Sequence, residues 1–406
     1  MSNVSDGTRI HVNELRIGMR VVQLEILEGS SPFLLDIIDV RTQADIQAIQ
    51  KICEYVFIDV KWQKSQHGYI PTRDSDSSKK LGFARAFEQT SNTFHKTSNL
   101  IKTVFDDIRF GNQLSVSAVK QAVSECVEQA LENPDAMLLL TQLKNQDEYT
   151  AQHSMNVCVF SILLGKELGF NLDELNKVGT CGLLHDIGKM KVPLEILNKP
   201  GKLEDYELEI MRKHTVYGRD VLMSARQLFS GTVDVAFSHH EHLDGKGYPR
   251  GIDSAGISIF TRVVAVLDAY DAITSDRVYQ RGKPHLIALG ILVKGMSSHY
   301  EGQYVTQFIN SIGFYPQGNI VELSSGDVGL VVEQNKADRL KPKILLILDS
   351  HKQPIERKIL DMSLNLRDAD GQLYRIKEII RPQDHSIDLH QLYQEGAFTK
   401  SYPLVS

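Results

Sequence analysis

Cysteines are few in this sequence, and they are widely spaced. Of 406 residues only 4 are cysteines, at Cys53, Cys126, Cys158 and Cys181, and no two of them form a CxxC pair. Disulfide frameworks and cysteine-based zinc sites depend on closer or more numerous cysteines. The spacing therefore argues against both classes, and it favours a reducing, cytoplasmic environment.

Long apolar segments are also missing. The first ten residues, MSNVSDGTRI, contain no apolar h-region of a secretory signal. The longest apolar runs, such as Met155–Leu164 and Ile344–Leu348, are well short of the roughly 20 residues that a membrane-spanning helix needs. We therefore expect neither export by that route nor insertion into a membrane, and we predict a cytoplasmic location.

A surplus of basic residues is absent as well. The chain has 45 Lys and Arg against 51 Asp and Glu, a formal net charge of −6. Proteins that coat nucleic acid carry a basic surplus, so bulk nucleic acid is not an expected partner. With 42% hydrophobic residues, a chain of this length is expected to fold into roughly two or three domains with at least one sizeable core.

Changes of pattern along the chain predict five parts. They are a small α+β N-terminal domain over 1–61, a polar linker over 62–80, a helical connector over 81–135, a domain dense in helical periodicity over 136–315, and a β-rich C-terminal extension over 316–406. Strands are expected in the extension because apolar segments alternate with Gly, Asn and Asp turns. These segments are Val321–Leu323, Gly329–Val332, Ile344–Leu348 and Tyr374–Ile380.

Two rows of a heptad repeat run along the predicted helix of the connector, between Phe83 and Ile108. One row holds Phe87, Phe94, Ile101 and Ile108, and the companion row holds Phe83, Thr90, Thr97 and Val104. Such rows are typical of a coiled-coil seam and would give a homodimer. They are equally typical of a helix that packs on its own domain, and the two threonines weaken the seam. Both alternatives remain open.

Histidine is the abundant functional residue type. There are 14 histidines, and six of them lie between His153 and His242. This region also predicts a series of helices, one capped by Asn171 and ending at His185, and others over Glu204–His214 and Ile259–Thr274. Their ends and interiors carry imidazoles and carboxylates. These are His153, His185, Asp186, His214, His239, His240 and Asp268.

These residue types together favour a metal centre. Neutral imidazole and carboxylate are ligands of Zn, Mn and Fe. Any one histidine is more often a buried core residue than a ligand, but five histidines and two aspartates exceed the ligands of one catalytic ion. Two ions bridged by a carboxylate would use them all, and such pairs catalyse phosphoryl transfer. The adjacent pair His185 and Asp186 suits this arrangement, because the aspartate can bridge both ions.

Three strings carry a resemblance to a known family. LLHDIGKMKVP from Leu183, HHEHLDGKGYP from His239 and DAYDAITSDRVY from Asp268 resemble, in this order, the HD-GYP phosphodiesterases of the HD metal-hydrolase superfamily. The resemblance covers about Asp147 to Phe314 and implies an all-α, HD-type helical bundle. Residues 12–61 are similar to the small domain that often precedes HD-GYP domains, a position suited to a protein partner.

The resemblance also implies an activity and a set of site residues. The activity is hydrolysis of cyclic di-GMP, a bacterial second messenger, to pGpG and GMP, with two divalent metal ions (Fe, Mn or Zn). The seven residues given above would be the metal ligands, with Asp186 as the bridge. Other roles fall on residues around them. Lys189 would contact the substrate phosphate, Gly247, Tyr248 and Pro249 would form a loop over the substrate with Tyr248 touching it, Arg277 would bind a phosphate oxygen, and Asp271 would orient a ligand or a water.

Two positions depart from the family pattern. Some members carry a Glu where this chain has Tyr149, and that Glu supports a third metal, so we predict two metals here. Many members carry Arg or Lys at the position of Gln280, and its loss weakens part of the predicted grip on the substrate. Three alternatives remain open: 3′,3′-cyclic GMP-AMP as the substrate, a sensor that binds cyclic dinucleotide without cleaving it, and a hydrolase of other phosphodiesters.

Overall fold

The computed structural model describes residues 8–16, 19–26, 38–40, 46, 49–50, 53–58, 76–143, 149–225, 227–276, 281–335, 338–368 and 370–405. The chain divides into two compact units. One unit comprises residues 1–74 and 286–295, and the other comprises residues 75–285 and 296–406. The candidate site residues described by the structure all belong to the second unit.

The N-terminal part forms a small antiparallel sheet. Its strands are β1 (Thr8–His11), β2 (Arg20–Ile26), β3 (Ile38–Asp39) and β4 (Cys53–Ile58), in the order β1-β4-β2-β3, and a 3₁₀ turn, η1 (Val12–Glu14), follows β1. Val56 of β4 is fully buried, and Ile46 and Ile49 are nearly fully buried.

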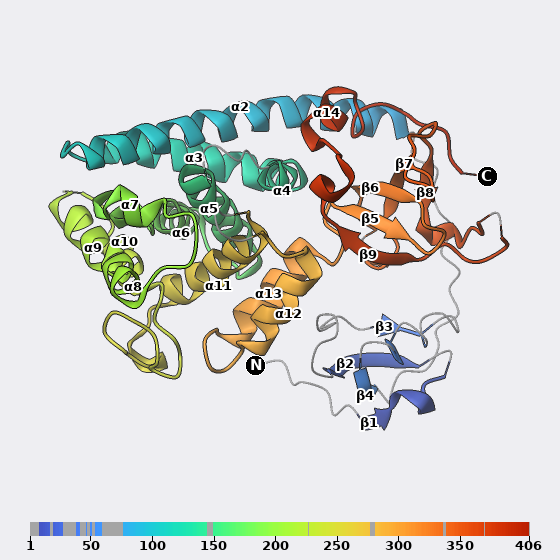
Figure 1. The fold of residues 1–406 in the computed structure, drawn as a ribbon, viewed down its shortest axis with the longest axis horizontal. Coiled ribbons are helices and arrows are strands. Elements are labelled where there is room, and N and C mark those ends of the chain that lie inside the picture. The colour runs from blue at the N-terminus through green and yellow to red at the C-terminus, as the bar shows by residue number, and fades with distance from the viewer. Residues whose placement is uncertain are drawn as a thin grey trace. The chain divides into compact units, whose positions relative to one another are not determined.

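Helices make up most of the second unit (Figure 1). They are α2 (Asp76–Arg109), α3 (Val116–Glu132), α4 (Pro134–Gln142), α5 (Tyr149–Glu167), α6 (Leu172–Leu184), α7 (Leu194–Leu197), α8 (Asp205–Arg212), α9 (His214–Ser224), α10 (Ser230–Ser238), α11 (Ile259–Thr274) and α13 (Gly302–Ile312). The 3₁₀ turns η3 (Ile187–Lys191) and η4 (Ser254–Gly256) connect some of them, and α12 (His285–Lys294) crosses the division between the units. Because α2 begins at Asp76, the last part of the predicted linker over 62–80 is helical.

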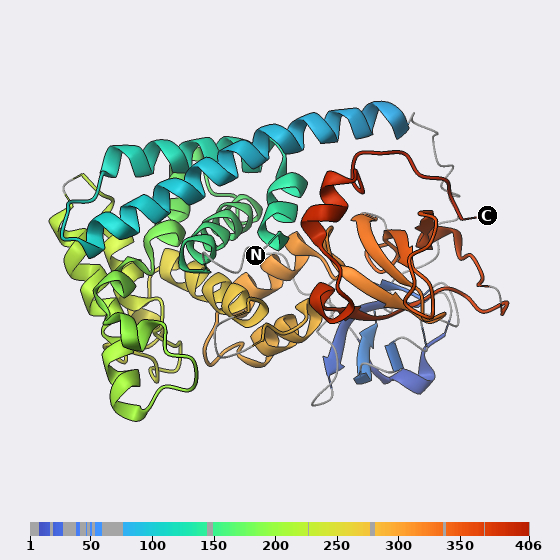
Figure 2. The same ribbon diagram turned by 45° about the horizontal axis from the view of Figure 1, so that its top comes forward.

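Helix α2 lies along α3 and packs within its own chain (Figures 1 and 2). Phe94 and the other three residues of its apolar heptad row are almost fully buried in the main core of the unit. The two threonines of the companion row face α3: Thr90 donates a hydrogen bond to Gln129 at 2.9 Å, and Thr97 accepts one from Cys126 at 3.3 Å. Both rows therefore pack within this chain. This is the alternative in which the helix packs on its own domain.

The helix boundaries follow local sequence signals. Asn171 begins α6 with a capping box in which its side chain and that of Glu174 each bond the other's backbone N–H. Helix α11 spans the predicted range and is capped by Ser258. The predicted helix over Glu204–His214 is wrong at its end: α8 stops at Arg212, and His214 is the first residue of α9.

The C-terminal residues form a five-stranded antiparallel sheet. Its strands are β5 (Ile320–Leu323), β6 (Val328–Glu333), β7 (Lys343–Leu348), β8 (Ile359–Asp361) and β9 (Ile376–Ile380), in the order β8-β7-β6-β5-β9. The 3₁₀ turn η5 (Met362–Leu364) lies between β8 and β9, and the 3₁₀ turn η6 (Pro382–His385) and helix α14 (Leu389–Gln394) follow β9. The predicted fold class, a helical bundle with a small α+β unit before it and a β-rich extension after it, is confirmed. The very short β8 and helix α14 were not predicted.

The sheet and the helices share one apolar core. Leu330 and Leu345 of the sheet belong to the same buried cluster as Phe87 of α2 and Leu139 of α4. At its edge, the rings of Phe87 and Tyr393 of α14 lie with their centroids 4.3 Å apart. Among the helices that the structure describes, none is long and apolar enough to cross a membrane.

Candidate metal centre

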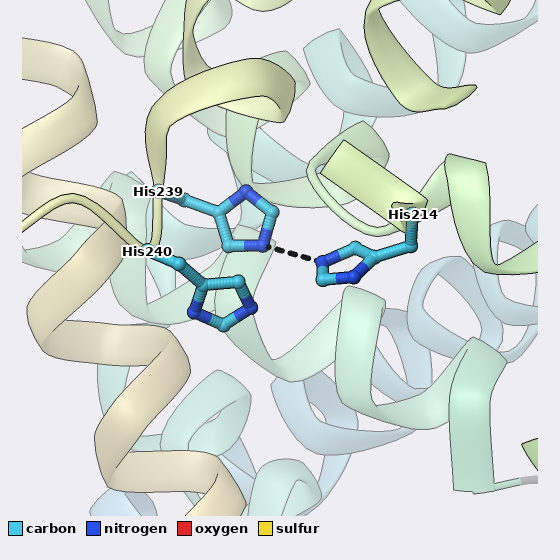
Figure 3. A group of neighbouring side chains, drawn as sticks. All are labelled: His214, His239 and His240. Carbon is cyan, nitrogen blue, oxygen red and sulfur yellow. Dashed lines mark hydrogen bonds between the residues drawn. The ribbon is translucent and has the colours of Figure 1, made fainter. Parts of the chain in front are cut away.

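The fold brings the seven predicted ligands together in two adjoining groups. His153 from α5, His185 at the end of α6, Asp186 at the start of η3 and Asp268 from α11 form the first group. His214 from the start of α9 and the neighbours His239 and His240 after α10 form the second (Figure 3). Within each group the candidate ligand atoms lie within 4.8 Å of one another. Residues far apart in the sequence therefore converge on one buried place.

Asp186 lies between the two groups, with one carboxylate oxygen toward each. Its Oδ2 is 3.4 Å from Nε2 of His153 and 3.3 Å from Nε2 of His185. Its Oδ1 is 3.5 Å from Nε2 of His214 and 3.7 Å from Nε2 of His239. This is the placement that a carboxylate bridging two cations requires.

Asp268 completes the first group from the side of α11. Its Oδ1 is 3.1 Å from Nε2 of His153 and 3.7 Å from Nε2 of His185, and its Oδ2 is 3.9 Å from Nδ1 of His240. The side chain thus reaches members of both groups. Two carboxylates and five imidazoles surround the same small volume.

Backbone carbonyls orient three of the imidazoles. Nδ1 of His185 bonds the carbonyl oxygen of Gly182 at 2.7 Å, Nδ1 of His214 bonds that of Met211 at 2.8 Å, and Nδ1 of His239 bonds that of Val235 at 3.1 Å. A carbonyl oxygen can only accept, so each Nδ1 carries the proton. In the neutral ring Nε2 then presents its lone pair to the site, as a metal ligand must.

Some buried polar atoms of the centre have no protein partner. In the described part of the chain, Nε2 of His185 and Oδ1 of Asp186 are buried without a hydrogen bond. Nε2 of His214 and Nε2 of His239, two atoms of the same kind, face one another at 3.3 Å (Figure 3). Unsatisfied buried polar atoms are costly. A divalent cation would satisfy all of them, so the residues present fit a metal.

The electrostatics of the second group also suit a cation. Burial lowers the pKa of His214 to about 3. Burial, followed by the neighbouring His239, lowers the pKa of His240 as well. Both imidazoles are therefore neutral at pH 7 and keep a lone pair for a ligand bond.

The first group carries the negative charge of the centre. Burial raises the pKa of Asp186, but Lys189 and His185 lower it by more than burial raises it. The pKa of Asp186 therefore lies well below its usual range. Burial lowers the pKa of His185, but the carboxylates of Asp186 and Asp268 more than offset this and raise it to about 9. Without a cation, the two carboxylates thus favour the protonated form of the His185 imidazole.

Asp271 lies one turn after Asp268 on α11 and touches a predicted ligand directly. Its Oδ2 accepts a hydrogen bond from Nδ1 of His153 at 2.8 Å and another from the Ser275 hydroxyl at 3.1 Å. Its Oδ1 accepts one from the Asn156 amide at 2.9 Å. A carboxylate in this position holds the imidazole ring and strengthens it as a ligand.

Gly188 allows η3 and α9 to approach closely. A Cβ atom at this position would lie 1.9 Å from the carbonyl oxygen of His214 and 2.3 Å from the backbone nitrogen of Gly218. The backbone after Asp186 therefore packs directly on the helix that begins with His214. This contact sets the spacing between the two groups of ligands.

Of the predicted substrate-contact residues, those that the structure describes lie beside the predicted ligands or in the loop after them. The Lys189 ammonium donates a hydrogen bond to Oδ2 of Asp186. The ring of Tyr248 stacks on that of His240 at 4.7 Å, with the Arg212 guanidinium 5.2 Å from its centre on α8. Gly247 has no room for a side chain, because a Cβ would lie 2.4 Å from the backbone of His240 and Glu241. Pro249 follows Tyr248 through a cis peptide bond.

Glu241 supports this loop and was not among the predicted site residues. It is 3% exposed, and its carboxylate accepts hydrogen bonds from the backbone N–H groups of Arg250 at 2.7 Å and Ile252 at 3.1 Å. The sequence offers no pattern that predicts this role, since the loop must close before the contacts exist. Arg277 and Gln280 lie outside the described residues, as does the side chain of Tyr149.

Comparison with known proteins gives the same assignment as the sequence strings. The profile of the HD domain family matches residues 138–304, and that of a domain of unknown function, DUF3391, matches residues 8–119. The chain is 34% identical over 372 residues to the cyclic di-GMP phosphodiesterase PA4108 of Pseudomonas aeruginosa, across 87% of this chain and 88% of the relative. It is 39% identical over 147 residues to 3′3′-cGAMP-specific phosphodiesterase 1 of Vibrio cholerae, across 36% of this chain and 33% of the relative.

Comparison with solved structures gives a partial match. The structure of Bd1817, described as an HDG"Y"P protein from Bdellovibrio bacteriovorus, matches with a TM-score of 0.47 and 17% identity, across 75% of this chain and 99% of that one. The helical fold and the clustered histidines and aspartates define an HD-domain protein. The near full-length relative from Pseudomonas then shows that the chain belongs to the HD-GYP phosphodiesterase family, as the sequence predicted.

Proposed function

We propose that this protein is a metal-dependent phosphodiesterase that hydrolyses cyclic di-GMP. The observation that carries the proposal is the position of Asp186, whose two oxygens face two separate groups of histidines. A site with a bridging carboxylate suits phosphodiester hydrolysis, because two cations stabilise the attacking and the leaving oxygen together. The Pseudomonas relative, which aligns along almost its whole length, is a cyclic di-GMP phosphodiesterase by name.

We assign two divalent ions to the site. His153, His185 and Asp268 would hold one, His214, His239 and His240 would hold the other, and Asp186 would bind both. When bound, the ions supply positive charge to the phosphoryl oxygens and lower the pKa of a water molecule. Imidazole and carboxylate accept Fe, Mn or Zn, so availability in the cell decides the metal.

The chain's own residues would fix the geometry around this charge. Asp271 holds the proton on Nδ1 of His153, which directs Nε2 of that ring into the site. Lys189, already at the bridging carboxylate, would donate a hydrogen bond to a phosphoryl oxygen and stabilise its growing charge. Arg277 would grip the phosphate by a charge-assisted hydrogen bond. No side-chain nucleophile is required.

Tyr248 would form one wall for the substrate. Its ring stacks on His240 and lies close to the Arg212 guanidinium, so these two side chains position it beside the centre. Gly247 and the buried Glu241 fix the loop that carries it. Cyclic di-GMP is cleaved first to pGpG, and a second cut gives GMP.

The proposal is tested with purified protein loaded separately with Mn, Fe or Zn. Metal content is measured, and cyclic di-GMP and 3′,3′-cyclic GMP-AMP are incubated side by side while pGpG and GMP are followed by chromatography. We expect turnover of cyclic di-GMP with about two metal ions bound per chain. Faster turnover of cyclic GMP-AMP would identify that molecule as the substrate instead. The Vibrio relative is named as a phosphodiesterase specific for it.

Variants separate catalysis from binding. Asp186→Asn should abolish turnover and lower the metal content, while His351→Ala, at an exposed histidine of the C-terminal extension, should change neither. Tight cyclic di-GMP binding with no turnover under any metal would instead identify a sensor. Neither binding nor turnover would reject the proposed function.

A further inference from the structure

A cavity of about 520 Å³ lies between the helical domain and the C-terminal sheet, inside the second unit. Its helical wall comes from the ends of α4 and α11 and the beginning of α5. Its other wall comes from the start of β5, the end of β9 and residues 381–390. Sites for small ligands have volumes of about 300–1,000 Å³, so the cavity can accept a nucleoside.

The cavity adjoins the candidate metal centre. His153 lines it, and Nε2 of the same ring is 3.1 Å from Asp268 and 3.4 Å from Asp186. Asn156, one helical turn later on α5, lines it as well and bonds Asp271. His153 therefore belongs both to the metal centre and to the wall of this cavity.

Both walls present an amide atom with no hydrogen-bond partner in the described part of the chain. Asn319, on the wall formed by the C-terminal extension, is 8% exposed, and its Nδ2 donor is unsatisfied. Asn156, on the opposite wall, is 1% exposed, and its Oδ1 acceptor is unsatisfied. Unpaired buried amide atoms are unfavourable in the free protein. They point to a ligand that offers both an acceptor and a donor, as the edge of a purine base does.

The C-terminal extension is also tied to the end of α11. The Arg381 guanidinium donates to both carboxylate oxygens of Asp276, at 2.7 and 2.9 Å. The same carboxylate accepts a hydrogen bond from the backbone of Gly282 at 2.7 Å. Asp276 directly precedes Arg277, the predicted phosphate-binding residue. The extension thus contacts the residue that directly precedes the predicted phosphate-binding position.

We infer that the C-terminal extension forms part of the substrate site: one purine base of the cyclic dinucleotide occupies this cavity, and Asn319 donates a hydrogen bond to it. This inference rests on the proposed function and assigns a specificity-determining role to a part of the chain outside the HD domain. Gln383, an exposed residue at the cavity, borders the same base.

Two variants test the inference against two substrates. Asn319→Leu removes the donor at similar volume, and Gln383→Trp places a ring in the cavity. The matched control is Gln372→Trp, at an exposed position of the extension that does not line the cavity. KM and kcat are measured for cyclic di-GMP and for bis(p-nitrophenyl) phosphate, a phosphodiester without bases, on the metal-loaded full chain.

We expect Asn319→Leu to raise KM for cyclic di-GMP about tenfold, the effect of one lost hydrogen bond to a buried group. Gln383→Trp should raise KM as well, because its ring would compete with the base for the cavity. Hydrolysis of bis(p-nitrophenyl) phosphate should be unchanged, since it needs only the metal centre. Asn319→Leu should also melt at the same or a higher temperature without substrate, because it removes an unsatisfied donor. A general folding defect would instead lower the melting temperature and slow both substrates.

The outcomes distinguish this inference from the proposed function. Normal KM for cyclic di-GMP in both cavity variants overturns the inference and leaves the proposed function intact. An equal KM increase in Gln372→Trp overturns it too, because the effect would not belong to the cavity. If the unmodified protein cleaves bis(p-nitrophenyl) phosphate but no cyclic dinucleotide, the proposed function fails, and this inference fails with it.

Discussion

Asp271 accepts a hydrogen bond from Nδ1 of His153 at 2.8 Å, although 118 residues separate them in the sequence. The contact joins α11 to α5 and fixes which nitrogen of the imidazole faces the metal centre. Asp271 is itself held by Asn156 and Ser275, so its carboxylate has a single orientation. The residue supports the centre without lying within it.

Asp271→Asn should weaken metal binding about 10–100-fold, the usual cost of losing a partner of a ligating histidine. In the variant, the amide N–H₂ group of the new side chain faces one of the residues that donate to Asp271, which are His153, Asn156 and Ser275. A donor then faces a donor, and that hydrogen bond is lost. Metal affinity is measured by competition with a chelator. Asp220→Asn, at an exposed carboxylate of α9, serves as the control and should keep the affinity of the unmodified protein. Unchanged metal affinity in Asp271→Asn would show that Asp271 does not position His153 for metal binding.

Gly188→Ala should separate the two groups of ligands. The added Cβ would lie 1.9 Å from the carbonyl oxygen of His214, so the backbone must move. Overpacking costs about 1–3 kcal/mol when side chains can adjust, and backbone contact places this case at or above that range. Gly218→Ala, on the other side of the same contact, has its nearest neighbour at 3.4 Å and should be tolerated. Thermal unfolding and metal content of the two variants should therefore differ clearly.

Phe94→Ala should destabilise the chain without changing its mass in solution. Phe94 is 3% exposed and packs in the core of its own chain, and truncation of a buried Phe costs about 3–5 kcal/mol. Asn92→Ala, at an exposed position of the same helix, should cost little. Chemical denaturation gives the stability, and sedimentation gives the mass. A dimer that dissociates on Phe94→Ala would contradict the internal packing.

Stability should fall as the pH drops from 6.5 toward 4, and His285 should account for part of the fall. Burial lowers the pKa of His285 to about 4, and its ring bonds the Tyr270 hydroxyl and the Gly313 carbonyl. Between these pH values the unfolded chain binds a proton at this position that the folded chain does not. The contribution is therefore complete above pH 6.5 and is lost by pH 4, about 3 kcal/mol at most.

His285→Gln removes that titration and keeps both a donor and an acceptor. The free energy of unfolding is compared at pH 7 and pH 4.5 for the two proteins. We expect a smaller decrease in the variant. Equal decreases would show that His285 does not contribute to the pH dependence.

Local signals predicted the elements well. Helix α11 spans Ile259–Thr274 as expected, because Ser258 caps its start and apolar residues keep a helical period. The break at Lys213 was missed, since Glu204–Lys213 and the residues after it are all compatible with a helix. The turn is stabilised by tertiary contacts, including the close packing of Gly188 on α9. His214 consequently begins a helix instead of ending one.

The sequence predicts the candidate ligands of the site better than it predicts the residues that hydrogen-bond to them. Histidines and aspartates in a family pattern identify a metal centre before any folding is considered. Which ligand Asp271 touches depends on how α5 and α11 pack, and the role of Glu241 depends on the closure of its loop. The cavity beside Asn319 needs two separate parts of the chain to meet. Such features arise from tertiary structure and leave no local pattern.

The ring contact between Phe87 and Tyr393 has a consequence for the modularity of the enzyme. The helices and the C-terminal sheet share a single buried cluster, so a fragment cut at the predicted boundaries of 136–315 would expose its interior on two sides. A stable fragment should therefore contain the connector and the extension together with residues 136–315.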